Sequence, residues 1–255
     1  MGGALLDGWR AGGLADSAIT VIDPAKPDVP VRVLEALPDE DLPDILVVAI
    51  KPQLAAQILA PLRPRMTAAT LVLSIMAGID CATLAQLCGA QSVVRAMPNT
   101  PARIGKGVSG LIGLGASAAQ KAQAEALMAA VGSALWMESE AQFDALTALS
   151  GSGPAYVFHF IEALTEAAVA QGLSRALAQA LARQTLFGSA ALAEQSGRDA
   201  GDLRREVTSP NGTTAAGLAQ LDGPQHHLIA LLTKTLEAAA ARSRAMAEEA
   251  RATAR

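Results

Sequence analysis

The stretch Asp144-Ala-Leu-Thr-Ala-Leu-Ser-Gly-Ser-Gly-Pro-Ala-Tyr-Val-Phe-His-Phe-Ile161 divides the chain into two parts of different character. Before it, short apolar runs alternate with helix-like segments, and after it almost every segment has a helical pattern. Its centre, Gly151-Ser-Gly-Pro154, predicts a flexible turn that leads into a helix, because proline suits the first helical position. Gly-Ser-Gly is also typical of a phosphate-binding loop. A joint between domains and a nucleotide loop are therefore both open at this point.

The part before this stretch predicts an α/β domain. Its apolar runs recur at a spacing of roughly 20–25 residues and alternate with helix-like segments, as in βα units with a mostly parallel sheet. The longest runs are continuously apolar, as expected of strands covered on both faces. The predicted strands are Ser17–Pro24, Val29–Val33, Ile45–Ile50, Thr70–Ile75, Gln91–Met97, Val108–Leu114 and Ala134–Met137. The predicted helices are Met1–Gly13, Pro52–Leu62, Cys81–Cys88 and Ser117–Val131, with Ser117 as an N-cap.

The part after the stretch predicts an all-α domain. Apolar residues recur with the helical period from Pro154, and glycines at 172, 197 and 223 separate the helices. The last helix is long and rich in alanine, and such a helix usually packs on more than its own small domain. We therefore expect two domains, residues 1–143 and 144–255, and a dimer formed through the second.

Composition excludes several classes of function. With 24 acidic and 20 basic residues, the chain offers no electrostatic case for binding nucleic acid or an anionic membrane. No run has the length and apolarity of a membrane span, and Asp7 and Arg10 interrupt the first apolar run, so no signal peptide is expected. The spacing of Cys81 and Cys88 matches neither a metal nor a redox motif. Reduced thiols in the cytoplasm are the expectation.

Polar residues follow the predicted strands, where ligands bind in open parallel sheets. Asp23 lies about 20 residues after Gly2, the distance at which an acidic residue binds a ribose hydroxyl in dinucleotide folds. A turn aspartate before proline is the alternative. Lys51 could equally be a surface lysine at a helix start. Asn99 predicts an N-cap that aims free amides at a ligand.

Two polar sets lie in the second half. His159, Glu162 and Glu166 share a helix face and could bind a metal, but no second ligand cluster completes the set, so no metal is predicted. Thr208–Thr214 is the densest polar segment and precedes a helix, so its hydroxyls and free amides suit a carboxylate. An ordinary capped turn is the alternative, which composition alone favours.

Five motifs occur along the chain at characteristic spacings. They are Val47-Val-Ala-Ile-Lys-Pro52, Ser74-Ile-Met-Ala-Gly78, Arg95-Ala-Met-Pro-Asn-Thr-Pro101, Ala148-Leu-Ser-Gly-Ser-Gly-Pro-Ala-Tyr156 and Thr208-Ser-Pro-Asn-Gly-Thr-Thr214. In order and spacing they resemble the motifs of pyrroline-5-carboxylate reductases. The resemblance covers the chain from Met1 onward, and other small Rossmann reductases do not share the last two motifs.

The resemblance implies reduction of 1-pyrroline-5-carboxylate to proline, the last step of proline biosynthesis, with NADPH or NADH as the cofactor. It implies a Rossmann-like domain and a helical domain that interlocks as a homodimer, with the substrate site between subunits; larger rings of dimers also occur in the family. The residues expected at the cofactor are Gly2, Asp23, Ala49, Ile50, Lys51, Pro52, Ile75, Met76, Ala77 and Asn99. The residues expected at the substrate are Ser209, Gly212, Thr213 and Thr214, with Thr214 as the catalytic contact to the ring nitrogen.

The chain departs from the family at its start. The family begins with a strand and a Gly-x-Gly-x-x-Gly turn, whereas Gly2 here aligns with the end of that turn. The absent strand would lie between the strands at Ile19–Asp23 and Ile45–Ile50, so two ladder edges are expected to be exposed. We expect a start codon assigned too late, rather than a shortened clone or a degenerate gene. A carboxylate at Asp23 would repel a 2′-phosphate and predicts a preference for NADH.

Two rival functions remain. The absent strand favours a non-catalytic helical dimer that has lost cofactor binding, and a related reductase of another imine or ketone is a third hypothesis. The complete segment Thr208–Thr214 and the strand ends at Lys51 and Asn99 favour the reductase. Gly151–Pro154 follows no strand of a βαβ unit, which favours the joint over the phosphate loop.

Overall fold

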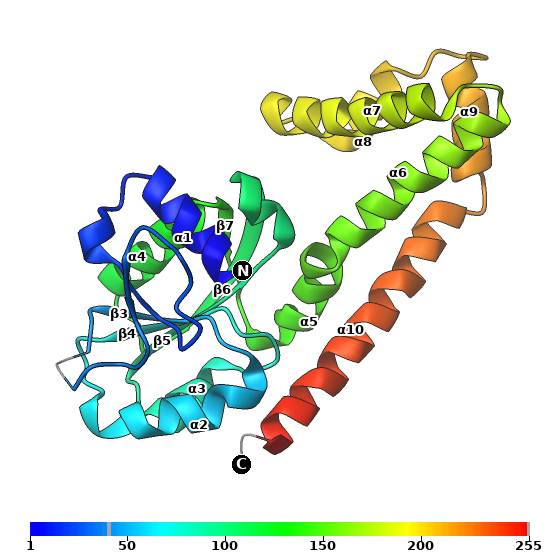
Figure 1. Ribbon diagram of the computed structural model, residues 1–255. Helices are drawn as coiled ribbons and strands as arrows, with labels where there is room; N and C mark the ends of the chain where they lie inside the picture. Colours follow the sequence, from blue (N-terminus) through cyan, green and yellow to red (C-terminus); the bar gives the residue numbers. More distant parts are fainter. Residues whose placement is uncertain (40–41, 254–255) are drawn as a thin grey trace. The chain divides into compact units, whose positions relative to one another are not determined.

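The computed structural model describes residues 1–39 and 42–253. Its contacts divide the chain into two units, one of Met1–Ser152 with Ala239–Arg255 and one of Gly153–Ala238 (Figure 1). The first unit contains a sheet with helices, and the second is helical. The predicted fold class, a Rossmann-like α/β part followed by an all-α part, is confirmed.

The main sheet of the first unit has the strand order β3-β4-β5-β6-β7. Strands β3, β4 and β5 are parallel, β6 is antiparallel to β5, and β7 is parallel to β6. The sheet is therefore mostly parallel, as predicted. The bounds are β3 Ile45–Val48, β4 Leu71–Ser74, β5 Ser92–Pro98, β6 Gly107–Leu114 and β7 Gly132–Trp136.

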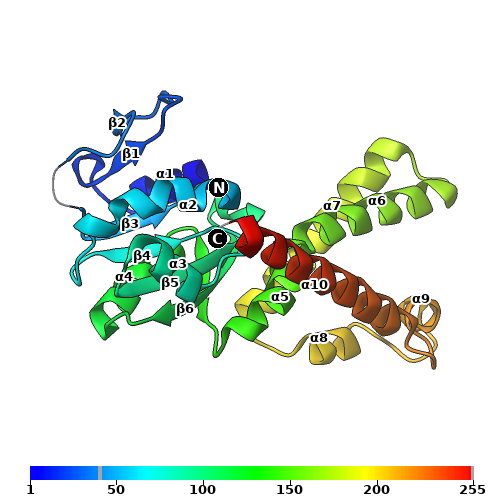
Figure 2. The ribbon, with the colours of Figure 1, turned by 90° about the horizontal axis from the view of Figure 1, so that it is seen from below.

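A second, two-stranded sheet lies apart from the main one (Figure 2). It consists of β1 (Thr20–Ile22) and β2 (Arg32–Leu34), which pair in parallel with Val21 opposite Val33. Within the described residues, β1 pairs only with β2, and β3 pairs only with β4. The sheet is thus interrupted between β1 and β3, where two exposed ladder edges were expected.

Two layers of helices cover the main sheet. Figure 1 shows α1 (Gly2–Ala11) and α4 (Ala118–Ala129) on one face, with α2 (Ala55–Leu59) and α3 (Cys81–Cys88) on the other. Side chains of β4 alternate between the layers, so that Leu71 and Leu73 pack with α1 and α4 while Val72 packs with α2 and α3. A continuously apolar strand results because both faces are buried.

Two of the helices in this unit show clear end signals. Ser117 caps α4 in a capping box with Gln120, as predicted from the serine before that helix. The expected helix Pro52–Leu62 is instead broken into a 3-10 turn (Pro52–Leu54), the short α2 and a second 3-10 segment (Ala60–Arg65). The single-helix prediction was wrong because the two prolines of that last segment have no N–H to donate within an α-helix.

The central stretch is helical almost throughout. After α5 (Phe143–Leu146) comes a π-helical turn, Thr147–Gly151, in which Ser152 N donates to Thr147 O at 2.9 Å, and α6 (Gly153–Ala170) follows. The flexible turn predicted at Gly151–Pro154 was therefore wrong. Glycine and proline often end helices, but here neither Gly151 nor Gly153 has a positive φ, and Pro154 lies in the first turn of α6, where a helix tolerates proline. The division between the two units falls at Ser152 and Gly153.

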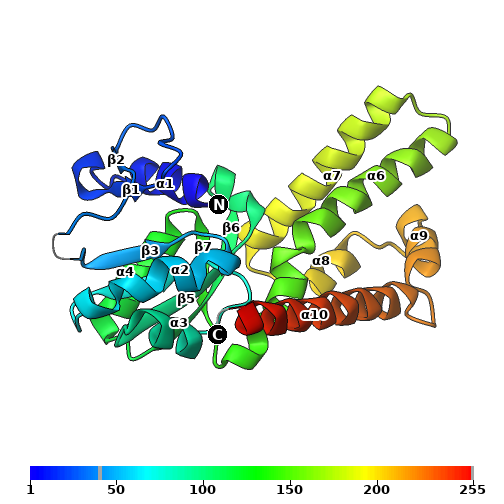
Figure 3. The ribbon, with the colours of Figure 1, turned by 60° about the horizontal axis from the view of Figure 1, so that its bottom comes forward.

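In the second unit, α6 and α7 (Arg175–Ser196) lie side by side (Figure 3). Between them Gly172 adopts a φ of +96°, which favours glycine, and Ser174 caps α7. Three further helices follow: α8 (Ala200–Glu206), α9 (Thr213–Leu221) and α10 (His227–Thr253), of which α10 crosses the division at Ala238. Among the described helices, none combines the length and the apolarity that crossing a membrane requires.

Candidate functional site

The carboxyl ends of β3 and β4 lie level at one edge of the main sheet, and β5 continues past them to Pro98. Val48 of β3 pairs with Ser74 of β4, and Ser74 pairs with Arg95 of β5. The segments that follow these strands carry most of the residues expected at the cofactor. The arrangement brings Ala49–Pro52 and Ile75–Gly78 to the same edge, where ligands of open α/β sheets bind.

Helix α1 begins at this edge. A Cβ built on Gly2 would lie 3.4 Å from the Cβ of Ala49, so the first turn of α1 lies against the end of β3. No side chain caps the N-terminus of α1. Free amides at a helix N-terminus attract an anion, and Ala49 is small and exposed beside them, as is Ala77 after β4 at the same edge of the sheet. These residues fit the pyrophosphate of a dinucleotide.

Asp23 follows β1 and forms a turn. Its backbone N–H donates to Leu34 O at 2.9 Å, and its Oδ1 accepts from Ala25 N at 2.8 Å. One carboxylate oxygen is therefore used within an Asx turn. The other oxygen, Oδ2, makes no hydrogen bond within the described part of the chain and is available to a ligand.

Four residues expected at the cofactor differ in how much of the side chain they expose. The side chain of Met76 is 2% exposed and belongs to the core between the sheet and α2 and α3, so only its backbone can face a ligand. Ile75 is half-buried, and Ala77 is exposed. Lys51 is also exposed and precedes the 3-10 turn at Pro52. Contacts of this edge with a ligand therefore depend on backbone atoms and small side chains.

Asn99 does not cap a helix with its side chain, so that prediction was wrong. Its Oδ1 accepts from Val108 N at 2.9 Å, and its Nδ2 donates to Ser150 O at 3.1 Å. The side chain is 9% exposed. The Asn99 side chain bonds Val108 N and Ser150 O instead of the amides of its own helix. It therefore joins the end of β5 to the start of β6 and to the π-helical turn.

An ion pair between a buried arginine and a partly exposed glutamate lies behind the same edge. Arg95 is 7% exposed, its Nη1 lies 2.5 Å from Glu140 Oε2, and its guanidinium is 4.1 Å from the centroid of the Phe143 ring. The other carboxylate oxygen of Glu140 accepts from Cys81 N at 2.8 Å. Burial, followed by the charge of Glu140, raises the pKa of Cys81 to about 12. Sequence analysis missed Glu140; the only signal was the position of Arg95 inside a motif.

The polar segment of the second unit forms a tight turn. Gly212 N donates to Ser209 O at 3.1 Å, with Pro210 and Asn211 at the two central positions. Asn211 has a φ of 58°, and proline followed by asparagine with positive φ is typical of a type II turn. A Cβ on Gly212 would lie 2.4 Å from Ser209 Oγ and 3.2 Å from Ser209 O, so a larger residue here would force the Ser209 hydroxyl to move.

Helix α9 starts directly after this turn without a side-chain cap. Gly212 is the N-cap residue, and the exposed Thr213 and Thr214 are the first two helical residues. Their hydroxyls make no hydrogen bond within the described residues. By contrast, the hydroxyl of Thr208 donates to Arg204 O at 2.6 Å. The first turn of α9 therefore offers free amides and two free hydroxyls, a set that suits a carboxylate.

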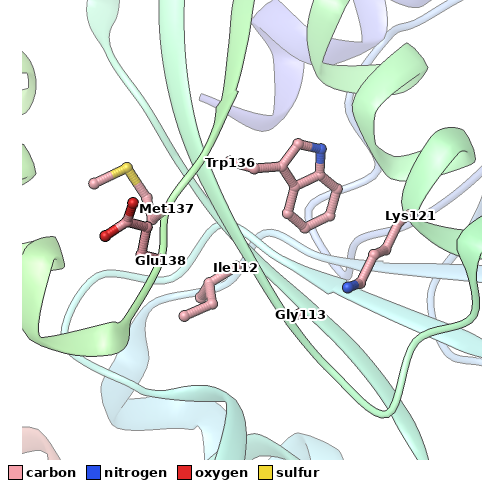
Figure 4. A pocket seen from close by; sticks show the side chains of 6 residues that line it. All are labelled: Ile112, Gly113, Lys121, Trp136, Met137 and Glu138. Atoms are coloured by element: carbon pink, nitrogen blue, oxygen red, sulfur yellow. The ribbon is translucent and has the colours of Figure 1, made fainter.

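Two surface hollows lie elsewhere. The first, of about 390 Å³, lies on β6 and β7, where Lys121 is 5.6 Å from the Trp136 ring (Figure 4). It is lined by Ile112, Gly113, Lys121, Trp136, Met137 and Glu138. The second, of about 410 Å³, is lined by Arg204, Arg205, Thr208, Ala215, Leu218, Ala219, Asp222 and Gly223. Neither hollow is lined by a residue expected at the cofactor or the substrate.

The polar face of α6 is ion-paired. His159 Nδ1 lies 3.2 Å from Glu162 Oε2, and Glu166 pairs with Arg175 at 2.6 Å. In the described part of the chain, no group of three or more His, Cys, Asp or Glu residues could hold a metal ion. The residues of this face thus have partners of their own.

Comparison with known proteins gives a consistent result. A family model described as pyrroline-5-carboxylate reductase dimerisation matches residues 140–246. The chain is 41% identical over 262 residues to the pyrroline-5-carboxylate reductase of Pseudomonas aeruginosa, covering 98% of this chain and 94% of the relative. The structure of a pyrroline-5-carboxylate reductase from Coxiella burnetii has a TM-score of 0.88 at 32% identity and covers 95% of this chain and 93% of its own. The Plasmodium falciparum pyrroline carboxylate reductase, solved with NADP bound, has a TM-score of 0.81 at 29% identity, with coverages of 97% and 94%.

Proposed function

The chain belongs to the pyrroline-5-carboxylate reductase family, and from this premise we propose that it reduces 1-pyrroline-5-carboxylate to L-proline with NADPH or NADH. This is the last step of proline biosynthesis. The observation that carries the proposal is the uncapped N-terminus of α9, where the hydroxyls of Thr213 and Thr214 are free. A cyclic imine with one carboxylate presents a matching anion and a ring nitrogen.

The cofactor is assigned to the first unit. The amides at the start of α1 would hold the pyrophosphate, and the small residues Gly2, Ala49 and Ala77 leave room for it. Ile50, Lys51, Pro52 and Ile75 complete this edge, and Met76 and Asn99 would contribute through their backbone because both side chains are buried. When bound, the reduced nicotinamide supplies a hydride.

The substrate is assigned to the turn and helix start in the second unit. Amides of the first turn of α9 and the hydroxyls of Ser209 and Thr213 would bind the carboxylate. Gly212 lets the backbone approach closely. The hydroxyl oxygen of Thr214 would accept a hydrogen bond from the N–H of the protonated ring nitrogen. As the hydride adds to the ring carbon of the C=N bond, the electron pair of that bond moves to the nitrogen, which carries the proton of the product amine.

This chemistry requires orientation more than a strong acid. A protonated imine is already electrophilic, so holding its carboxylate and nitrogen in one geometry accounts for most of the catalytic effect expected of the chain. Thr214 then acts by orienting and steadying the nitrogen. A hydroxyl with no other partner suits this role better than the hydroxyl of Thr208, which is used inside the chain.

The test compares two threonines as a matched pair. Oxidation of NADPH or NADH with 1-pyrroline-5-carboxylate, with proline measured as the product, gives kcat/KM for Thr214→Val and Thr208→Val. Valine keeps the shape and removes the hydroxyl. We expect Thr214→Val to lose roughly 10- to 100-fold in kcat/KM, a transition-state loss of about 1.4–2.7 kcal/mol. Equal and small effects of the two substitutions would overturn the role of Thr214.

The interrupted sheet favours a second candidate, a helical dimer without cofactor binding. Fluorescence titration of this chain with NADH and NADPH separates it from the reductase. Saturable binding of either dinucleotide supports the reductase, and no binding supports the helical dimer. Turnover of another cyclic imine or ketone acid, with none of the pyrroline carboxylate, would indicate a related reductase instead.

The second domain is assigned to dimerisation. Large apolar side chains are exposed along its helices, and exposed apolar patches of this kind mark protein interfaces. They include Val157, Phe158, Phe187, Leu192, Ile229 and Leu231.

We assign residues 1–143 to cofactor binding and residues 144–255 to substrate and dimer contacts. Dimers of this kind could assemble further into a ring, and the molar mass in solution would show whether they do. The two free, buried cysteines support a reducing cytoplasmic location.

A further inference from the structure

The carboxylate of Glu140 joins elements that are far apart in the sequence. It lies at the start of a 3-10 turn, Glu140–Gln142, that leads into α5. One oxygen accepts from the backbone N–H of Cys81 at 2.8 Å, and the other lies 2.5 Å from Nη1 of Arg95. All of these residues belong to the first unit. A single side chain thus ties α5 to the first turn of α3 and to β5.

The amide bound by Glu140 is the first of α3. Cys81 is the first helical residue, and Asp80 caps the same helix by accepting from Thr83 N at 2.7 Å. The segment Ile75–Asp80, which connects β4 to this helix, carries Ile75, Met76 and Ala77 of the proposed cofactor edge. Because the segment Ile75–Asp80 runs directly into α3, holding the first turn of α3 also holds the Asp80 end of that segment.

Two of the helices that begin at this edge, α1 and α3, differ in their free donors. The N-terminus of α1 has no side-chain cap, whereas carboxylates of Asp80 and Glu140 occupy amides of α3. An anion placed at α3 would meet two negative charges and occupied donors, while α1 offers free amides. Glu140 thereby helps to direct the phosphates of a dinucleotide to α1.

Arg95 holds the carboxylate in place. Its guanidinium lies against the Phe143 ring, and its Nε is buried with no hydrogen-bond partner among the described residues. Glu140 is the one carboxylate that the structure places on this guanidinium within the described chain. A buried cation with a single anionic partner strongly resists separation, because its charge would be left uncompensated.

We infer that Glu140 is a positioning residue of the cofactor site, which acts through Cys81 N–H and Arg95 to hold the segment Ile75–Asp80 in its binding conformation. The inference rests on the proposed function. Glu140 touches neither cofactor nor substrate in this scheme. Its loss should weaken dinucleotide binding and leave the recognition of the imine substrate unchanged.

The decisive test removes one N–H. Cys81→Pro deletes the donor to Glu140, and proline suits the first position of a helix. Asp80 has φ −81° and ψ 166°, which are compatible with a following proline. Cys81→Ala is the matched control, because it removes the thiol and keeps the N–H. Fluorescence titration gives Kd for NADH and NADPH, and steady-state kinetics at saturating cofactor gives KM for the imine.

We expect Kd of Cys81→Pro to exceed that of Cys81→Ala by roughly tenfold, with KM for the imine unchanged. Glu140→Gln should also raise Kd, whereas Glu138→Gln, an exposed carboxylate two residues away (Figure 4), should not. If Glu140→Gln fails to fold, the comparison of Cys81→Pro with Cys81→Ala still tests the inference. Equal Kd values for Cys81→Pro and Cys81→Ala would overturn the positioning role of Glu140 and leave the proposed function standing. A wild-type chain that binds neither dinucleotide overturns the proposed function with it.

Discussion

The side-chain amide of Asn99 donates to the carbonyl oxygen of Ser150 at 3.1 Å, across 51 residues of sequence. The same side chain accepts from Val108 N, so one buried residue joins β5, β6 and the π-helical turn. The link holds the end of β5, where Asn99 follows the strand, against the π-helical turn that precedes α6.

Asn99→Ala should destabilise the protein by about 2 kcal/mol, because it leaves an amide and a carbonyl without their partner. Chemical denaturation without cofactor measures the free energy of unfolding. Thr100→Ala, at the exposed next residue, is the control and should stay within about 0.5 kcal/mol of wild type. An Asn99→Ala protein as stable as this control would contradict the role of the two hydrogen bonds.

Gly132→Ala should destabilise the protein by about 3 kcal/mol or more. Gly132 has a φ of +144°, and a Cβ there would lie 1.9 Å from Gly107 O, an atom of the neighbouring strand that cannot move away. Gly3→Ala is the control: it lies in α1 with open space around it and should gain up to about 1 kcal/mol. Thermal melting followed by circular dichroism compares the two, and a well-folded Gly132→Ala would refute the prediction.

Stability should fall as the pH rises above about 9, the ordinary pKa of a thiol, toward the raised pKa of about 12 for Cys81. In this window the folded state keeps a proton that the unfolded state releases, so unfolding becomes easier with rising pH. Below the window the stabilisation is fully present. The difference in unfolding free energy between wild type and Cys81→Ala should therefore shrink above pH 9. A constant difference across the window would argue against the shift.

Asp23→Asn should move the cofactor preference toward NADPH. Removing the charge removes its repulsion of a 2′-phosphate, so the ratio of kcat/KM for NADPH to that for NADH should rise by roughly five- to tenfold. Asp28→Asn, which removes an exposed carboxylate from the same connection, is the control. Equal ratios in both variants would mean that Asp23 serves only its turn with Ala25.

Phe187→Glu should weaken the dimer. Phe187 on α7 is 68% exposed in a single chain, and a charge there would be buried at a helical interface. Ile104→Glu is the control: Ile104 is 77% exposed but lies outside the segment that matches the dimerisation family. Light scattering after size exclusion should detect monomers for Phe187→Glu only. The same mass for both variants would place the interface elsewhere.

Local patterns in the sequence predicted the order of the strands and helices. The continuously apolar run Thr70–Ile75 predicted a strand buried on both faces, and the observed β4 is fully buried. The serine before α4 predicted its cap, and Cys81–Cys88 was predicted with the observed bounds. These predictions succeeded because each depends on residues a few positions apart.

Predictions failed where a distant residue or a missing donor decided the outcome. The glycines at 151 and 153 were predicted to form a flexible turn, yet both lie in helical backbone, and a Cβ on Gly151 would lie 3.4 Å from the side chain of Met97 on β5. Proline N atoms without hydrogens divided the helix expected after Lys51. Asn99 was expected to cap locally, and its amide instead found partners 9 and 51 residues away.

The sequence by itself determined the βα alternation, the helical second half and the motifs of the family, because hydrophobic periodicity and local turn chemistry are written within short segments. Tertiary structure alone decided which distant side chain occupies a helix N-terminus. The N-cap residues Met1 and Gly212 leave α1 and α9 without side-chain caps, whereas the fold brings Glu140 onto α3 with Arg95 behind it. The physical reason is that occupancy of an amide depends on which side chain the fold carries to it, and that residue can lie 59 positions away.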